Sequence, residues 1–503
     1  MKKLFRRLSG LCCLLFLCSA YSAEPKNVLF ISIDDLRVDL GCYGAEHIIS
    51  PNFDKLAESG MLFENAFCQQ AVCTPSRAVV FTGKRPDSVG VIHLRDHFRT
   101  KHPDILTLPQ LLQKHGYRTQ SLGKVLGTGD SVSWTEPGMN NPNPRNLCTS
   151  ARKYADPDMV NEVQAEYDAA LEAGLTGIKF ERAARGPVME IADVEDEGYY
   201  DGRLAIAAIA ALRRLKDLGD PFFLGVGFTK PHLPFNAPKK YWDLYDGIDL
   251  PHLTNDFHPS KAPWFVLGRS AEFHGYDGSP SGTVPMEIAM NYRRAYYACI
   301  SYVDALLGKL LDELDTLGLS ESTSVILWSD HGFKLGEHDS WGKSSNVELD
   351  IRVPLMIRVP GEKGGVGRSS ALVELVDLYA TVTDILEIDP PHQMEGISLL
   401  PLLKNPNQPW KTAAFSQYPR SVGEDELERV AWDLMGYTIR TERYRLTRWD
   451  SVIVPGRVEG IELYDHLTDS EENYNVAREA KYADVVEELS NRLDQGWQGA
   501  LPR

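Results

Sequence analysis

Cys73, Pro75 and Arg77 lie within the segment QQAVCTPSR, a combination suited to binding an anion. Proline is well accepted in the first turn of a helix, so we expect a helix that begins at Pro75 with Cys73 just ahead of it. The free N–H groups and partial positive charge of a helix start stabilise an anion. As a plain thiol, Cys73 is therefore expected to be an activated thiolate, and the alternative interpretation is a buried structural cysteine.

Three apolar runs end in polar residues that would complete such a site. These residues are Asp34 and Asp35 after VLFISI, Asp330 and His331 after VILWS, and His232 shortly after PFFLGVGF. Such runs are typical of buried strands, and open α/β sheets place their sites beyond the carboxyl ends of strands. A single Asp at a strand end also serves as a turn or cap residue. Three such ends together favour a functional site.

Strand and helix patterns alternate over most of the chain. One face of the segment after Asp201 carries apolar residues at helical spacing, and a second helix is expected from about Met286 to Leu317. The sequence therefore predicts an α/β fold with a largely parallel central sheet flanked by helices. Residues 136–185 and 251–284 are rich in turn-forming residues and are expected to be surface excursions.

The C-terminal region has a different character. MGYTIRT, from Met435, and YRLTRW, from Tyr444, are typical of two antiparallel strands, and a helix is expected from Asp484 to Gln495. We therefore predict a catalytic domain over residues 24–415 and a small α+β C-terminal subdomain over residues 416–503.

The first 23 residues have the pattern of a secretory signal peptide: basic residues, a short apolar run and small residues at the end. The apolar run is too short to span a bilayer. We expect an exported, periplasmic or secreted protein without stable membrane insertion; a lipid anchor at Cys18 is the weaker alternative. Five cysteines follow the leader, so at least one is expected to be unpaired.

The bulk composition restricts the partners. A formal net charge of −17 argues against nucleic acid or an anionic membrane, while an anionic small substrate remains compatible if positive charge is concentrated in the site. The hydrophobic content of 43% supports a sizeable core.

The pattern Cys-x-Pro-x-Arg in CTPSR resembles the signature of the formylglycine-dependent (type I) sulfatases of the alkaline-phosphatase-like superfamily. The nearest resemblance is to the iduronate-2-sulfatase group, and it covers nearly the whole chain after the leader. The segments that carry it are DDLRVDLGCYG, SPNFDKLAESGMLFENAFCQQAVCTPSR, TKPHLPF, SDHGFKLGEH and MGYTIRT. The resemblance implies that a formylglycine-generating maturation enzyme converts Cys73 to an aldehyde, so that no thiol remains to be oxidised.

The resemblance also implies a metal site. Asp34, Asp35, Asp330 and the formylglycine at position 73 would hold one divalent cation, usually Ca²⁺, which prefers oxygen ligands. His331 stands where many sulfatases have an asparagine ligand and the iduronate group has histidine. It is expected either to bind the metal or to donate a hydrogen bond to the sulfate.

By the same resemblance, one hydroxyl of the hydrated aldehyde attacks the sulfur and the sugar alcohol leaves. The second hydroxyl then loses its proton, the aldehyde reforms and sulfate is released. Arg77, Lys124 and Lys343 match the cations that hold the transferring group, and His232 matches the candidate general acid.

Gly127 departs from the family pattern, because sulfatases commonly have a histidine three positions after the lysine of GKV. That histidine handles the proton of the formylglycine hydroxyl. Thr128, His93 or His97 are possible replacements, although His93 and His97 are rather expected to be surface or substrate-binding residues.

These observations predict an exported sulfuric ester hydrolase whose substrate is a sulfated carbohydrate, with a 2-O-sulfated uronic acid as the first candidate. The alternatives are a sulfatase for another sugar or small ester, a phosphonate or phosphodiester hydrolase, and a pseudoenzyme or carbohydrate-binding protein. The last is disfavoured, because a decayed site would not keep so many costly charges together.

Overall fold

The computed structural model describes residues 26–139, 146–268, 270–280, 282–390, 393–421 and 433–502. The predicted signal peptide, residues 1–23, lies outside these ranges. Within them, no helix combines the length and the apolar character that a membrane span requires.

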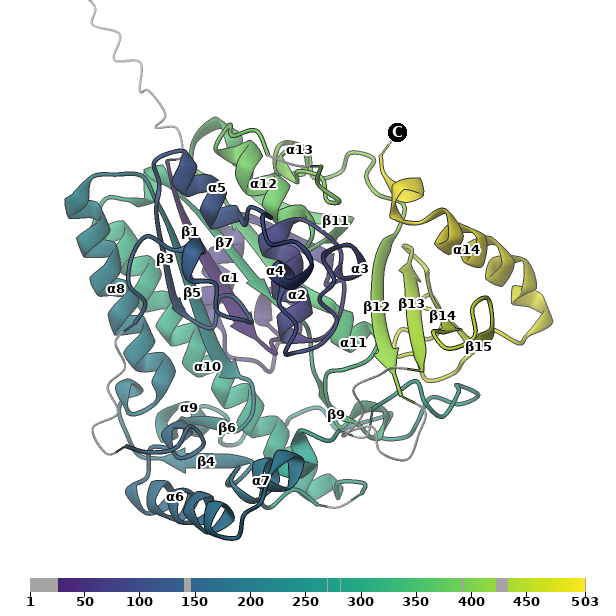
Figure 1. Cartoon of the computed structure of the whole chain (residues 1–503), viewed down its shortest axis with the longest axis horizontal. Coiled ribbons are helices and arrows are strands. Elements are labelled where there is room, and N and C mark those ends of the chain that lie inside the picture. Colours follow the sequence, from purple (N-terminus) through teal and green to yellow (C-terminus); the bar gives the residue numbers. More distant parts are fainter. Residues whose placement is uncertain are drawn as a thin grey trace, which may run out of the picture.

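A seven-stranded sheet forms the centre of the described structure, with the strand order β11-β2-β10-β7-β1-β5-β3 (Figure 1). Its strands are β1 (Asn27–Asp34), β2 (Met61–Phe67), β3 (Arg118–Gly123), β5 (Phe222–Pro231), β7 (Thr323–Ser329), β10 (Arg352–Arg358) and β11 (Gly367–Glu374). Neighbouring strands are parallel except β10, which is antiparallel to both β2 and β7. The prediction of a mostly parallel central sheet is confirmed.

Helices cover both faces of this sheet. Leu29 and Ile31 of β1 belong to a core that includes α8 and α10, whereas Phe30 belongs to the opposite core with α2 and α12. The alternation follows from the two-residue period of a strand. The helices are α1 (Pro51–Glu58), α2 (Cys73–Thr82), α3 (Pro86–Val89), α4 (Phe98–Lys101), α5 (Leu108–Lys114), α6 (Pro157–Glu172), α7 (Gly177–Ala183), α8 (Tyr200–Leu218), α9 (Lys239–Asp243), α10 (Met286–Thr316), α11 (Glu348–Ile351), α12 (Asp377–Ile385), α13 (Leu400–Lys404) and α14 (Ala483–Gln495).

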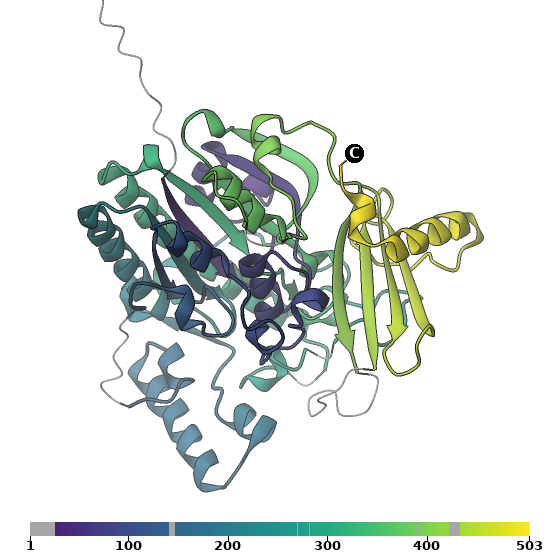
Figure 2. The same ribbon diagram turned by 45° about the horizontal axis from the view of Figure 1, so that its top comes forward.

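The predicted helices after Asp201 and from Met286 are confirmed as α8 and α10. The first expected excursion contains α6 and α7, which project from the rest of the molecule (Figure 2). Its chain continues into β4 (Met189–Ala192), which pairs with β6 (Phe235–Pro238) just after β5. A short hairpin of β8 (Lys334–Leu335) and β9 (Trp341–Gly342) follows β7.

The C-terminal region forms a separate four-stranded antiparallel sheet. Its strands are β12 (Ala414–Arg420), β13 (Leu434–Arg440), β14 (Tyr444–Ser451) and β15 (Val458–Asp465). The two expected strands are β13 and β14, whereas β12 and β15 were not predicted. Leu489 of α14 packs on one face of this sheet. The backbone N–H of Gln417 donates to the carbonyl of Gln69 (2.8 Å), which connects the small sheet to the segment just before Cys73.

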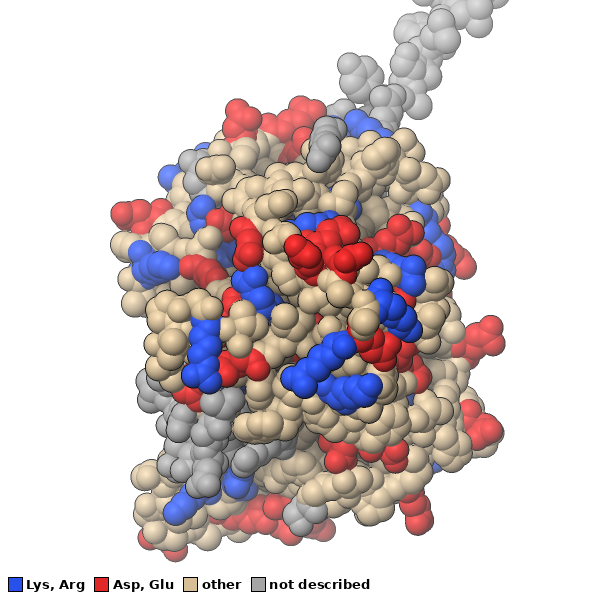
Figure 3. All heavy atoms as spheres, turned by 90° about the vertical axis from the view of Figure 1, so that its right-hand side faces the viewer, with Lys and Arg blue, Asp and Glu red and all other residues tan. Residues whose placement is uncertain are grey.

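The face of the molecule that includes the C-terminal subdomain carries interspersed acidic and basic side chains, without a broad basic patch (Figure 3). This distribution agrees with the acidic net charge of the chain. Cys42, Cys68, Cys73, Cys148 and Cys299 are unpaired thiols in the structure, and all except Cys148 are buried.

Candidate active site

Cys73 is the first residue of α2, two residues earlier than expected, because the N–H of Ser76 already donates to the carbonyl of Val72 (3.0 Å). The thiol is almost fully buried, with 4% of the residue exposed. Burial and the nearby Asp34 carboxylate raise the pKa of Cys73 well above its usual value. Burial therefore disfavours the thiolate that was expected for an unmodified Cys73.

Carboxylates from the ends of two adjacent strands meet beside Cys73. Asp34 ends β1 and Asp330 follows β7, and both are buried. Asp35 has a φ of 62°, which is a strained conformation for a residue other than glycine. Its carbonyl accepts from the hydroxyl of Tyr296 (2.6 Å) and its N–H donates to Asp330 Oδ1 (3.3 Å). These two bonds hold Asp35 in that conformation.

The donor set suits a hard divalent cation. One group of potential ligand atoms that lie within 4.8 Å of one another comes from Asp34, Cys73, Asp330 and His331, and a second comes from Asp34, Asp35, Cys73 and His232. His331 Nε2 lies 3.3 Å from Cys73 Sγ and 3.5 Å from Asp35 Oδ1. Three carboxylates with one imidazole match the oxygen-rich ligation that calcium prefers.

Arg77 is completely buried beneath these carboxylates. Its Nε donates to Asp330 Oδ2 (2.9 Å) and its Nη2 to Asp34 Oδ1 (3.2 Å). Its Nη1 donates to Ser32 Oγ (3.1 Å) and to backbone carbonyls. In this structure the guanidinium orients the two carboxylates, which the sequence alone did not indicate.

Two lysines reach the site from opposite sides. Lys124 Nζ lies 3.4 Å from Cys73 Sγ and 2.5 Å from Asp34 Oδ2. Lys343 Nζ lies 2.9 Å from Asp35 Oδ2. Burial alone would raise the pKa of Asp34, but the charges of Lys124, His232 and Arg77 lower it well below its usual value. The carboxylates therefore stay ionised, ready to hold a cation.

Glu272 is a site residue that the sequence analysis missed. Its carboxylate lies 3.3 Å from His232 Nε2 and 3.0 Å from Lys343 Nζ, and its side chain is 38% exposed. The residue comes from the second surface excursion, where no motif or period marks it. His232 Nδ1 contacts the carbonyl of Leu233 (2.7 Å), so Nε2 is the nitrogen that faces Glu272 and the site. Burial and the charge of Lys343 lower the pKa of His232, although Asp35 and Glu272 raise it.

The other two histidines occupy a neighbouring segment. His97 Nδ1 accepts from the N–H of Arg99 (3.1 Å), which caps α4, and Nε2 contacts the carbonyl of Gly129 (3.1 Å). The N–H of His93 donates to Asp96 Oδ2 (2.7 Å). The hydrogen-bond partners of the Cys73 thiol among the described residues are His331 and Lys124. The segment that carries His93 runs beside the start of α2, because the carbonyl of Leu94 accepts from Oγ1 of Thr74 (2.9 Å).

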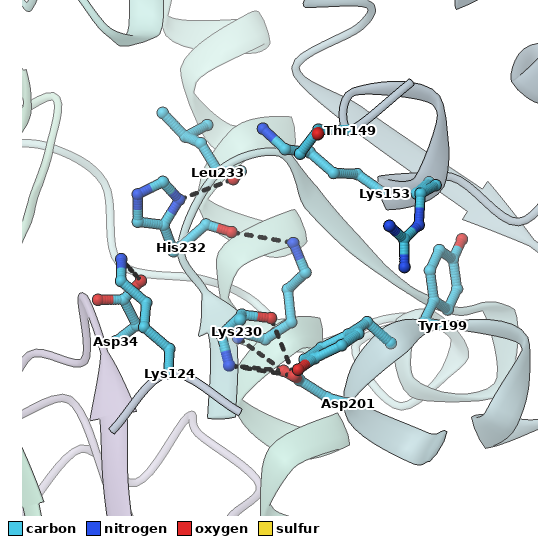
Figure 4. Close-up of a pocket in the computed structure, with 12 residues that line it drawn as sticks. Asp34, Lys124, Thr149, Lys153, Tyr199, Asp201, Lys230, His232 and Leu233 are labelled. Carbon is cyan, nitrogen blue, oxygen red and sulfur yellow. Dashed lines mark hydrogen bonds and ion pairs between the residues drawn. The ribbon is translucent and has the colours of Figure 1, made fainter. Parts of the chain in front are cut away.

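A cavity of about 360 Å³ opens beside these residues (Figure 4). Its lining combines catalytic candidates with residues of the first excursion and of α8: Asp34, Lys124, Thr149, Arg152, Lys153, Tyr199, Tyr200, Asp201, Thr229, Lys230, His232 and Leu233. The cavity is large enough for a sugar residue next to Cys73, and it is rich in cations.

The mostly parallel sheet, whose strand ends gather three carboxylates beside the first residue of a helix, has the alkaline-phosphatase-like fold. Solved structures of this class are similar over most of their length. A protein in complex with its substrate D-glucosamine-2-N,6-O-disulfate matches with a TM-score of 0.71 at 23% identity, covering 95% of this chain and 98% of the other. The phosphonate monoester hydrolase of Agrobacterium radiobacter matches with a TM-score of 0.70 at 24% identity, covering 93% and 95%.

The chain belongs to the sulfatase family. Residues 26–388 match the family model described as sulfatase, and residues 336–498 match the C-terminal model of N-sulphoglucosamine sulphohydrolase. Human iduronate 2-sulfatase is 33% identical over 486 residues, which cover 85% of this chain and 86% of the human protein. The protein is thus a type I sulfatase, an enzyme that hydrolyses sulfate esters.

Proposed function

We propose that this sulfatase is an exported enzyme that removes the 2-O-sulfate of a uronic acid in a polysaccharide, with a formylglycine at position 73 as nucleophile. The observation that carries the proposal is the position of Cys73, whose Sγ lies between Lys124 Nζ (3.4 Å) and His331 Nε2 (3.3 Å) beside three buried carboxylates. The similarity to human iduronate 2-sulfatase supports the choice of substrate.

In this proposal, Cys73 Sγ stands where the oxygens of the hydrated formylglycine would lie. A divalent cation, with Ca²⁺ as the first candidate, would be held by Asp34, Asp35, Asp330 and His331 and would supply charge neutralisation at the sulfate.

The side chains around position 73 have distinct tasks. The ammonium groups of Lys124 and Lys343 lie where they would hold the sulfate oxygens, while Arg77 keeps Asp34 and Asp330 oriented from below. His232 Nε2 would donate a proton to the oxygen of the sugar as the sulfur–oxygen bond breaks. Its Nδ1 contact with Leu233 fixes the ring so that Nε2 faces the site.

Mass spectrometry and activity measurements test the proposal together. Protein from a host with the maturation machinery should show an aldehyde at position 73, and Cys73→Ala should abolish sulfate release from 4-nitrophenyl sulfate and from sulfated sugars. Full activity of Cys73→Ala would overturn the assignment of position 73 as the nucleophile. A panel of defined sulfated sugars and a phosphonate monoester then tests the substrate. Preferred cleavage of a different sugar ester or of the phosphonate would contradict the uronate assignment. Binding without turnover would indicate a carbohydrate-binding protein.

A further inference from the structure

Lys153 carries a charge in the cavity beside the active site without an acidic partner. It is the last residue of the 3₁₀ turn Ala151–Lys153 in the first excursion. Its Nζ donates to the hydroxyl of Tyr276 (3.2 Å) and lies 5.5 Å from the centre of that ring. Among the described residues, no carboxylate oxygen lies within 4.0 Å of it. Burial and the charge of Lys230 lower the pKa of Lys153 to about 8, although the more distant Glu272 carboxylate raises it.

Lys230 is a second cation of the same cavity, and it is almost fully buried. Its Nζ donates to the carbonyls of His232 (3.0 Å) and Pro234 (2.5 Å), which are neutral acceptors. Figure 4 shows the side chains of Lys153 and Lys230 extending toward the middle of the cavity from two different segments. Arg152 and Lys124 also line the cavity, so its wall carries four lysine and arginine side chains.

The two carboxylates of the lining compensate these charges only in part: burial lowers the pKa of Lys230 below its usual value, although the Asp201 carboxylate raises it. Asp34 is paired with Lys124 and Arg77. Asp201 accepts from the backbone N–H groups of Thr229 and Lys230. Withdrawing incompletely compensated cations from water is costly, and an anionic group of a ligand in the cavity would reduce that cost.

We propose that this part of the cavity is a second anion subsite, in which Lys153, assisted by Lys230, binds a carboxylate or a second sulfate of the sugar whose ester is cleaved at position 73. Lys124 and His232 line the same cavity, so both anionic groups can belong to one substrate molecule. The inference rests on the proposed function and narrows it, because it requires a sugar with at least two negative groups and makes Lys153 a specificity-determining residue.

Kinetics of Lys153→Met test this subsite. The substrates are a 2-O-sulfated uronic acid, its carboxyl-reduced analogue, a disulfated hexosamine and 4-nitrophenyl sulfate, which has no second anion. We expect the KM of one of the two doubly charged substrates, the 2-O-sulfated uronic acid or the disulfated hexosamine, to rise about 10- to 100-fold. This factor corresponds to the loss of one charge-assisted hydrogen bond. The kcat values and the hydrolysis of 4-nitrophenyl sulfate should change less than twofold, and Lys153→Arg should restore part of the affinity. Lys216→Met, an exposed lysine near the end of α8, is the matched control.

The outcomes separate this inference from the proposed function. A similar KM change for singly and doubly charged substrates would overturn the subsite. If the 2-O-sulfated uronic acid loses more affinity than the disulfated hexosamine, the bound group is the carboxylate; the reverse result identifies the second sulfate. If the 2-O-sulfated uronic acid is not cleaved at all, the substrate assignment fails. The subsite is then tested by glucuronate and by the disulfated hexosamine as inhibitors of 4-nitrophenyl sulfate hydrolysis: weaker inhibition by either compound in Lys153→Met supports it, and unchanged inhibition by both overturns it.

Discussion

The backbone of Gly127 lies directly against Thr74, the residue that follows the proposed nucleophile position. A Cβ placed on Gly127 would be 2.6 Å from Cα and 2.7 Å from Oγ1 of Thr74. Contacts this short require the two backbones to separate, since Cα cannot turn away as a flexible side-chain end can. The histidine that sulfatases commonly have at this position has no room here unless the start of α2 moves.

We therefore expect substitutions of Gly127 to lower both stability and activity. Gly127→Ala should cost about 1–3 kcal/mol of the free energy of unfolding, as overpacking does, and Gly127→His should reduce kcat further because it displaces Cys73. Chemical denaturation and sulfate release measure the two effects. Gly129→Ala is the control, because a Cβ at position 129 meets nothing within 4 Å and should be tolerated. A gain of activity in Gly127→His would contradict this packing argument.

The pair of His232 and Glu272 predicts a pH dependence. A general acid must be protonated, and burial lowers the pKa of His232 below its ordinary value of about 6.5. The kcat for sugar sulfates should therefore fall as pH rises through this lowered pKa. The fall should be absent in His232→Asn, which should lose about 10²- to 10⁴-fold of the rate.

Glu272→Gln should shift the same fall to lower pH, because the Glu272 carboxylate favours the charged imidazolium and Lys343 disfavours it. The measurement is the pH profile of kcat, and Glu287→Gln, an exposed residue at the start of α10, is the control. A shift to higher pH would show that His232 does not titrate in the way that its neighbours indicate.

The three buried carboxylates predict that a cation stabilises the folded state. A ligand that binds only the native protein adds about 2.7 kcal/mol at a concentration of 100 times its Kd, so Ca²⁺ should raise Tm and a chelator should lower it. Chelation should also abolish sulfate release. In Asp330→Asn the response of Tm to Ca²⁺ should be much smaller, because one ligand of the group is lost. An equal response in the variant would place the bound cation elsewhere.

The carboxylates of the candidate metal site were predictable because they depend on regular structure. Continuous apolar runs mark β1 and β7 as buried strands, and these strands pair in parallel with Ile33 opposite Ser329. Asp34 and Asp330 each come one residue later, so adjacent strand ends bring them together. The sequence pattern therefore predicts both the strands and the end of the sheet at which the site forms.

Other parts of the site depend on contacts that no local pattern encodes. Glu272 and Lys153 come from irregular excursions without hydrophobic periodicity, and only the tertiary structure brings them to His232 and the cavity. The protonation state of an unmodified Cys73 could not be predicted for a related reason: the start of a helix is visible in sequence, but the burial that raises the pKa of the thiol is not. The strands β12 and β15 were missed because their apolar pattern is weak beside the many charged residues around them.

Lys411 predicts a stability effect far from the reaction. Its Nζ, just before β12, lies 2.8 Å from Glu374 Oε2 and 2.6 Å from Asp377 Oδ1, and all three side chains are at most 2% exposed. Removing the ammonium leaves two buried carboxylates next to each other, so Lys411→Met should lower the free energy of unfolding by about 3–5 kcal/mol. Urea denaturation followed by fluorescence measures this loss, and Lys404→Met, an exposed lysine at the end of α13, should change it by less than about 0.5 kcal/mol. Under conditions in which Lys411→Met remains folded, its kcat for 4-nitrophenyl sulfate should equal that of the unchanged protein. Near-normal stability of this variant would contradict the prediction. It would show that Arg85, which lies 2.8 Å from Glu374, compensates the charge of the carboxylates alone.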